Sequence, residues 1–342
     1  MANEDPAPLL SPESNQHKQH HLEELSRKAK ITLILSTSFF LITSIYYSPT
    51  STLLLPVILA PTALLLAYRL NLPQPQRGIL EIILWIYLGT ATISTALLII
   101  VQGALAYVAA WLLFREDRDW FLKEFQTVSR ESDVRDDAHR VQRAEFAARP
   151  SYWVFMLIMT FVLAGLCEEV QKYVSIVLAV RSRKREAKEN ARGAEVVAGR
   201  SEYLIYGATA GLSFATIEMY MFLVAGAAKA KSNGELAKTV AERFVIGMAA
   251  HLLCGLSTAL GMYRRDIEKA KTGMLQVILR SALCHGAVDF GLMAFCAVKG
   301  NVGWLHPEDL VGTLTCYVMS VSGTSLLGWL VWQELKETQK MK

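Results

Sequence analysis

The chain has 342 residues, of which 52% are hydrophobic and 19% are charged, and its mean hydropathy is +0.28. The apolar residues gather into long blocks, which excludes an ordinary soluble enzyme and indicates an integral membrane protein of several helical spans. The formal net charge of +4 gives no indication of nucleic-acid binding, because the basic residues lie in the connections between apolar blocks.

Residues 1–30 are polar, and no apolar core follows the initiator methionine. We therefore expect a disordered cytosolic tail rather than a cleaved secretory signal. Within it, Asp5-Pro6-Ala7-Pro8-Leu9-Leu10 matches the acidic dileucine pattern of eukaryotic endomembrane sorting, a pattern short enough to arise by accident. It favours an endomembrane such as the endoplasmic reticulum, Golgi or vacuole.

Residues 31–114 are expected to form the N-terminal membrane helices. Ile31–Tyr47 and Ser51–Tyr68 predict a transmembrane hairpin, with the second helix bent near Pro56 and Pro61. The block Gly78–Phe114 is too long for one ordinary span, and its composition alone does not divide it.

Glu81 and Gln102 are the polar breaks in that long block. Residues 115–149 then form a charged connecting segment, which we expect to be partly helical. Within it, Trp120 and Phe121 are candidates for contact with the membrane interface, where aromatic side chains are enriched.

Five further apolar segments have the length of membrane spans, and we assign them to a membrane core over residues 150–333 with a cytosolic tail at 334–342. Their bounds are Trp153–Val180, Leu204–Ala228, Phe244–Tyr263, Met274–Val298 and Leu310–Trp332.

The connections between these segments alternate in charge. Arg181–Arg200 holds seven basic residues, and Arg264–Lys271 and Lys336–Lys342 are also basic, whereas Lys229–Arg243 and Lys299–Asp309 are poorer in positive charge. By the positive-inside rule the first three are cytosolic. An all-α bundle of about eight spans, with both termini cytosolic, is the predicted fold.

The span Trp153–Val180 contains Glu168, Glu169 and Lys172 within one helical turn. Ionisable residues at membrane depth are costly, and they usually face a partner or a polar cavity. Lys172 lies three and four residues after the two acids, so it can pair with either one. A purely structural ion pair needs one acid, and the second glutamate indicates chemistry.

The next three spans each carry further ionisable residues, at Glu218, at His251, and at His285 with Asp289 four positions later. From the helical rise, Glu168 and His251 lie about 18 Å from the cytosolic ends of their spans, and Glu218 and His285 lie roughly 20 Å from theirs. These residues are therefore expected to form one layer near the bilayer midplane. Acids and imidazoles in one pocket supply a general base and a general acid, and equally suit a zinc ion.

The five cysteines lie inside or at the edges of apolar blocks, and their spacing matches neither a disulfide framework nor a zinc knuckle. We interpret them mainly as small apolar helix residues. They are Cys167, Cys254, Cys284, Cys296 and Cys316.

Four motifs on successive spans together resemble the PrsW family of intramembrane proteases, in the superfamily of type II CAAX prenyl endopeptidases. They read Glu168-Glu169-x-x-Lys172, Phe214-x-x-x-Glu218, His251-x-x-x-Gly255 and His285-x-x-x-Asp289. The resemblance covers about residues 153–298. The earlier spans and the charged connection carry none of these motifs.

This resemblance implies hydrolysis of a peptide bond in a membrane-anchored peptide or protein. Glu168 would activate water, with Glu169 beside it and Lys172 orienting the pair. The other four residues would complete the pocket as metal ligands or as donors to the oxyanion, with zinc held by His251, His285 and Glu218 if a metal is used. The four residues are Glu218, His251, His285 and Asp289.

Three other functions use a similar polar layer. A non-catalytic scaffold would need it only for helix packing, and a proton-coupled transporter would use it as a proton relay. Transporters of many spans often show two similar halves, and this sequence shows no internal repeat. A membrane-embedded lipid cyclase would need the acids but not the histidines and the aspartate.

Overall fold

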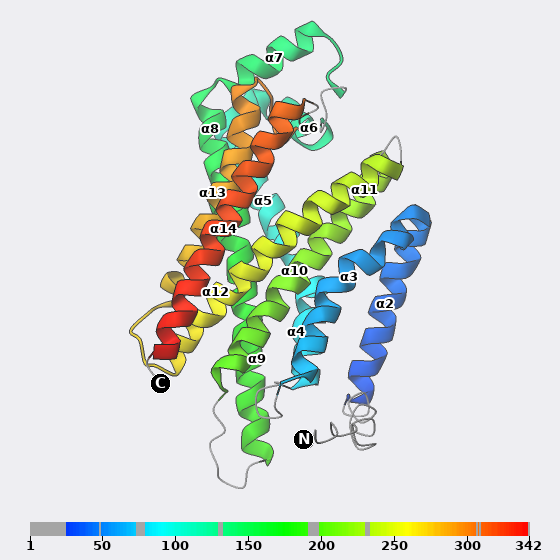
Figure 1. Cartoon of the computed structure of the whole chain (residues 1–342). Coiled ribbons are helices and arrows are strands. Elements are labelled where there is room, and N and C mark those ends of the chain that lie inside the picture. The colour runs from blue at the N-terminus through cyan, green and yellow to red at the C-terminus, as the bar shows by residue number, and fades with distance from the viewer. Residues whose placement is uncertain are drawn as a thin grey trace, which may run out of the picture.

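The computed structural model describes residues 25–47, 49–72, 79–128, 133–190, 198–229, 233–305, 307 and 309–340. Across these ranges the regular structure is entirely helical (Figure 1). Eight helical segments of the described part are long and apolar enough to cross a membrane, which agrees with the predicted bundle. The dileucine pattern and most of the polar tail lie outside the described residues.

The first two helices, α2 (Arg27–Tyr47) and α3 (Pro49–Leu70), form the expected hairpin at one edge of the bundle (Figure 1). α2 begins four residues before the predicted apolar block, so the last residues assigned to the polar tail are helical. Pro56 and Pro61 both lie inside α3. Ile58, between them, is buried against side chains of the central helix α10 (Arg200–Lys229).

The long block is one nearly continuous helical segment made of α4 (Leu80–Gly89), η2 (Thr90–Ser94) and α5 (Thr95–Phe114). η2 is a π-helical turn, and Thr95 Oγ1 donates to the Thr90 carbonyl oxygen at 2.7 Å across it. The block is therefore a single long helical segment that counts as one candidate span.

The charged connection folds into η3 (Arg115–Asp117), α6 (Arg118–Thr127) and α7 (Asp137–Ala147) at one end of the bundle (Figure 1). Phe121 is fully buried against Phe146 rather than exposed at a membrane interface, and Trp120 also packs on Phe146. The expectation was wrong for Phe121, which lies in the core of a small cap formed by α6 and α7, whereas Trp120 is partly exposed on this cap and its contact with the membrane interface stays a prediction.

The remaining elements follow in order along the chain. They are α8 (Pro150–Leu157), η5 (Ile158–Leu166), α9 (Cys167–Asn190), α10 (Arg200–Lys229), α11 (Asn233–Glu242), η6 (Arg243–Gly247), α12 (Met248–Asp266), α13 (Met274–Val298) and α14 (Leu310–Lys340). α10 is the most deeply buried span and contacts α3, α4, α9 and α12.

Glycines set the closest helix crossing in the bundle, between α10 and α12. A Cβ atom at Gly207 would collide with the Gly255 carbonyl oxygen, and one at Gly211 would collide with the His251 carbonyl oxygen. Small residues allow two backbones to approach in this way inside a membrane. This crossing holds His251 against the central helix.

A second close crossing joins η5 to α13. A Cβ atom at Gly165 would lie 2.6 Å from the Ala282 carbonyl oxygen, and one at Gly286 would lie 2.7 Å from a ring carbon of Phe161. His285 directly precedes Gly286, so this contact brings His285 beside the start of α9. The beginning of α2 and the end of α14 lie at the same end of the bundle (Figure 1).

Candidate active site

The paired glutamates lie in the first turn of α9, directly after η5, a π-helical segment of nine residues. π-Helical turns are rare and occur often at functional sites. The Leu163 carbonyl oxygen in this segment accepts a hydrogen bond from Gln102 Nε2 at 2.7 Å. The wide turn thus exposes a backbone acceptor that α5 satisfies with a side chain.

Glu169 and Lys172 form a fully buried ion pair. Lys172 Nζ also lies 3.0 Å from His251 Nδ1, and His251 Nε2 lies 2.9 Å from Glu218 Oε2. Because an ammonium group has only donors, Nδ1 accepts, and the neutral ring donates from Nε2 to Glu218. Three helices are therefore joined by one chain of hydrogen bonds.

His285 stands among three carboxylates. Its Nδ1 lies 3.5 Å from Glu169 Oε1, and its Nε2 lies 3.4 Å from Asp289 Oδ2 and 3.7 Å from Glu168 Oε2. The His285 ring also meets the His251 ring edge to face, with centroids 5.1 Å apart. His285 therefore lies between the two glutamates of α9 and the ring of His251.

The two adjacent glutamates have different surroundings. Glu169 is neutralised by Lys172, whereas Glu168 receives a weak hydrogen bond on Oε1 from Gln102 Nε2 at 3.4 Å. Each glutamate keeps a buried Oε2 atom that has no hydrogen-bond partner within the described structure. Of the two carboxylates, only that of Glu168 has no lysine beside it, and its side chain is 11% exposed against 0% for Glu169.

Exposure rises across the cluster from one side to the other. The side chains of Glu169 and Lys172 are 0% exposed, that of Glu168 is 11% exposed, and those of Glu218 and Asp289 are 24% and 36% exposed. The buried ion pair therefore closes one side of the cluster. Glu218 and Asp289 are the most exposed carboxylates of the cluster.

A divalent ion can be held by donor atoms of this cluster if His251 releases one of its two hydrogen bonds, to Lys172 or to Glu218. Glu168, His251 and His285 each offer a ligand atom, and these atoms lie within 4.8 Å of one another. Two imidazoles with one carboxylate is a ligand set of catalytic zinc sites, and the unpartnered Glu168 Oε2 has lone pairs for an ion. A second set replaces the first two residues by Glu169 and Cys254, but there the carboxylate is already paired with Lys172.

All seven residues singled out in the sequence meet in this cluster, although they come from four spans. Lys172 pairs with Glu169 rather than with Glu168, and the three-residue metal set contains Glu168 where the sequence suggested Glu218. Gln102 was not predicted as part of the site. Its signal was present, since it is a single amide in a long apolar block.

A bundle with eight candidate spans, holding acids and imidazoles in one buried cluster with one carboxylate that no lysine neutralises, is the architecture of a membrane-embedded enzyme. The model of the PrsW family of intramembrane metalloproteases matches residues 82–322, and the chain belongs to this family. It is an integral membrane protein and an intramembrane protease.

The family match begins at Ile82, well before the motifs that carried the resemblance. It includes most of α4, all of α5 and the charged connection, which the sequence motifs had left outside the family. Gln102 lies within this added region. No curated protein and no solved structure was found to match the chain.

Proposed function

We propose that the protein hydrolyses a peptide bond of a membrane-anchored substrate, with Glu168 as the general base that activates water. The observation that carries this assignment is the difference between the two adjacent glutamates. Lys172 holds the charge of the fully buried Glu169, while Glu168 has no lysine beside it and its side chain is 11% exposed. A general base needs a carboxylate oxygen that is not held by a cation and lies within reach of the water.

In the proposed reaction, Glu168 accepts a proton from water as the water oxygen bonds to the substrate carbonyl carbon. The carbon–nitrogen bond then breaks, and the proton passes from Glu168 to the leaving amine. His285, 3.7 Å from Glu168, is the donor placed to stabilise the oxyanion, and Asp289 orients its ring. The one proton that Glu168 takes from water is thus returned to the product amine, and the remaining hydroxyl group becomes part of the new carboxyl group.

The remaining residues position this machinery. Glu169 and Lys172 fix the first turn of α9, and Glu218 fixes the tautomer of His251 through its hydrogen bond. When bound, a zinc ion would polarise the carbonyl group and lower the pKa of the attacking water. Glu168, His251 and His285 are the residues that would hold it, and Glu168 would then act as a ligand in place of its role as the base.

Glu168→Gln tests the base directly, because the amide keeps the shape of the side chain but cannot take a proton. Cleavage of a membrane substrate should fall by roughly 10²–10⁴-fold at unchanged protein abundance. Asp309→Asn, at the exposed start of α14 and far along the chain from the cluster, is a control expected to retain activity. Full activity of Glu168→Gln would end this proposal and leave the scaffold interpretation.

The metal is tested by composition rather than by activity. Purified protein should contain about one zinc ion per chain if two histidines and a carboxylate bind it. His285→Ala should lose that metal, and Cys284→Ala, the neighbouring change, should retain it. Metal-free wild-type protein that remains active would instead support water activation by Glu168 alone.

A further inference from the structure

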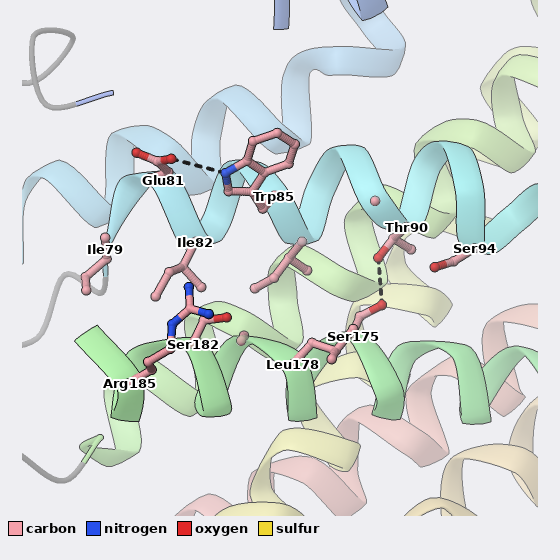
Figure 2. A pocket seen from close by; sticks show the side chains of 13 residues that line it. Ile79, Glu81, Ile82, Trp85, Thr90, Ser94, Ser175, Leu178, Ser182 and Arg185 are labelled. Carbon is pink, nitrogen blue, oxygen red and sulfur yellow. Dashed lines mark hydrogen bonds between the residues drawn. The ribbon is translucent and has the colours of Figure 1, made fainter. Parts of the chain in front are cut away.

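A pocket of about 480 Å³ lies between α4 and α9, apart from the catalytic cluster (Figure 2). Its rims are Trp85 and Leu178, which are 41% and 56% exposed, so it opens sideways on the surface that the bilayer would cover. Figure 2 shows the two helices lining it from opposite sides. The walls between the rims combine the apolar side chains of Ile82, Ile86 and Ala179 with the hydroxyl group of Ser182.

The two ends of the pocket differ in charge. At one end, the Thr90 and Ser175 hydroxyl groups are 2.8 Å apart and close it. At the other end, the Arg185 side chain points from α9 toward α4 (Figure 2). The exposed residues Arg181 and Lys184 add positive charge to this end of α9.

The one acid of the pocket wall, Glu81, is already engaged. Its carboxylate accepts hydrogen bonds from the Ser26 amide at 3.1 Å, the Ser26 hydroxyl at 2.7 Å and Trp85 Nε1 at 3.2 Å. These bonds hold the carboxylate to its own side of the pocket. A ligand at this end therefore meets a predominantly positive surface.

We propose that this pocket binds one anionic phospholipid, with an acyl chain along its apolar walls and the phosphate group beside Arg185. Basic pockets between membrane helices recognise anionic headgroups in this way. The apolar middle, open to hydrocarbon, suits an acyl chain. The proposal concerns a site separate from the catalytic cluster, and it stands whether or not Glu168 is the general base.

The size of the pocket distinguishes a lipid chain from a substrate helix. A helix with its side chains is about 10–12 Å across, so two turns of it occupy roughly 1,000 Å³. The pocket offers about 480 Å³, which lies in the range of pockets for single small ligands. One acyl chain is therefore the occupant that its volume favours.

Gly89 provides a sharp test, because it lines the pocket and a Cβ atom there would meet nothing within 4 Å. Gly89→Leu should fill the space without pushing on the fold. Gly103→Leu is the matched control, since Gly103 lies on the same helical segment outside the pocket and is equally open. Both changes are made in the Glu168→Gln protein, so that lipid binding is measured without turnover.

The readout is native mass spectrometry of the purified protein in detergent after addition of phosphatidylglycerol or phosphatidylcholine with the same acyl chains. We expect one tightly retained phosphatidylglycerol, and Gly89→Leu should weaken its binding by roughly tenfold or more, because two groups cannot share one volume. Gly103→Leu should bind as the parent does. Unchanged binding by a folded Gly89→Leu protein overturns the pocket assignment.

Leu178→Trp narrows the opening from the other rim and replaces Gly89→Leu if that protein does not fold. Arg185→Gln should remove the preference for phosphatidylglycerol over phosphatidylcholine, while Lys123→Gln, exposed on α6 at the other end of the bundle, should keep it. Equal binding of the two lipids by the parent protein overturns the headgroup assignment. Displacement of phosphatidylglycerol by inorganic phosphate alone would show that the site binds a free anion, and it would overturn the assignment of a phospholipid to the pocket.

Discussion

At the scale of single residues, Lys172 determines whether the buried side of the cluster is electrostatically balanced. It is fully buried, pairs with Glu169 and reaches His251 at 3.0 Å. Removing one partner of a buried ion pair leaves an uncompensated charge, whereas removing both is often tolerated. The two adjacent glutamates should therefore respond differently to loss of this lysine.

Lys172→Met is expected to lower the free energy of unfolding by about 3–5 kcal/mol, because it leaves the Glu169 carboxylate buried alone. Lys172→Met with Glu169→Gln should recover most of that stability. Denaturation of the purified variants in detergent measures both values. Combining Lys172→Met with Glu168→Gln is the control, and recovery there instead would mean that the lysine pairs with the other glutamate.

Gln102→Leu is expected to reduce cleavage severalfold, because an ordinary hydrogen bond contributes about 0.5–1.5 kcal/mol and the bond to Glu168 is weak at 3.4 Å. The change removes the donor to Glu168 Oε1 and to the Leu163 carbonyl oxygen. Turnover and protein abundance are measured side by side, with the exposed neighbour Val101→Leu as the control. Equal activity of the two variants would remove Gln102 from the site.

The sequence identified seven site residues because charged side chains inside apolar spans are conspicuous. It could not choose the partner of Lys172, since both glutamates lie at helical spacing and only packing selects between them. Gln102 was not predicted as part of the site, because an uncharged amide in an apolar helix is a weaker signal than a charged side chain. Its contact with Glu168 joins residues 66 positions apart, which spacing along the chain cannot reveal.

At the scale of helices, glycine contacts rather than side-chain interdigitation bring the site together. Gly211 touches the backbone of α12 at His251, so α10 and α12 cannot separate without moving this histidine from Glu218. Close backbone approach of this kind depends on the absence of a Cβ atom. The crossing is therefore sensitive to the smallest possible substitution.

Gly211→Ala is expected to reduce both thermal stability and cleavage, because the added methyl group would collide with a backbone carbonyl oxygen that cannot turn away. Gly247→Ala, just before α12, is the matched control, since a Cβ atom there meets nothing within 4 Å. Melting temperature and turnover are measured for both variants. Indistinguishable behaviour of the two would mean that α12 can shift without cost.

Length and hydropathy predicted which segments span, and Met274–Val298 was predicted with the bounds that the structure has. Other helix ends were missed by several residues, because basic residues at a membrane surface extend the helix beyond its apolar block, as at the start of α2 and the end of α9. The π-helical segments had no sequence signal. They depend on how neighbouring helices pack, as η5 does with α13.

At the scale of the whole molecule, we propose that the basic end of α9 faces the cytosol and the α6–α7 cap faces the lumen. The two lie at opposite ends of the bundle (Figure 1). The alternation of basic and less basic connections supports this orientation. The structure of the bundle shows only that the basic end of α9 and the α6–α7 cap lie at opposite ends, not which end faces the cytosol.

In sealed microsomes, a cysteine introduced at Lys184 should react with a membrane-impermeant reagent added outside. A cysteine at Glu145, which is exposed on α7, should react only after the membrane is opened. Labelling is quantified against the unmodified protein, which already contains five cysteines. The reverse pattern would invert the orientation and leave the site geometry unchanged.

One face of α9 connects two distant parts of the protein. Glu168, Gln171, Ser175 and Arg185 share this face, and it runs from the catalytic cluster to the charged end of the pocket. Between them, Gln171 Nε2 donates to Thr95 Oγ1 at 3.1 Å and ties α9 to α5. A ligand that rotated or shifted α9 at one end would therefore affect both the catalytic cluster and the pocket.

Such a linkage has a thermodynamic requirement. If occupancy of the pocket changed the affinity of the cluster for a substrate analogue by some factor, the analogue would change the affinity of the pocket by the same factor, because the two binding free energies close one cycle. The composition of the surrounding bilayer would then enter the enzyme's specificity, and the substrate would in turn select which lipids remain attached to α9.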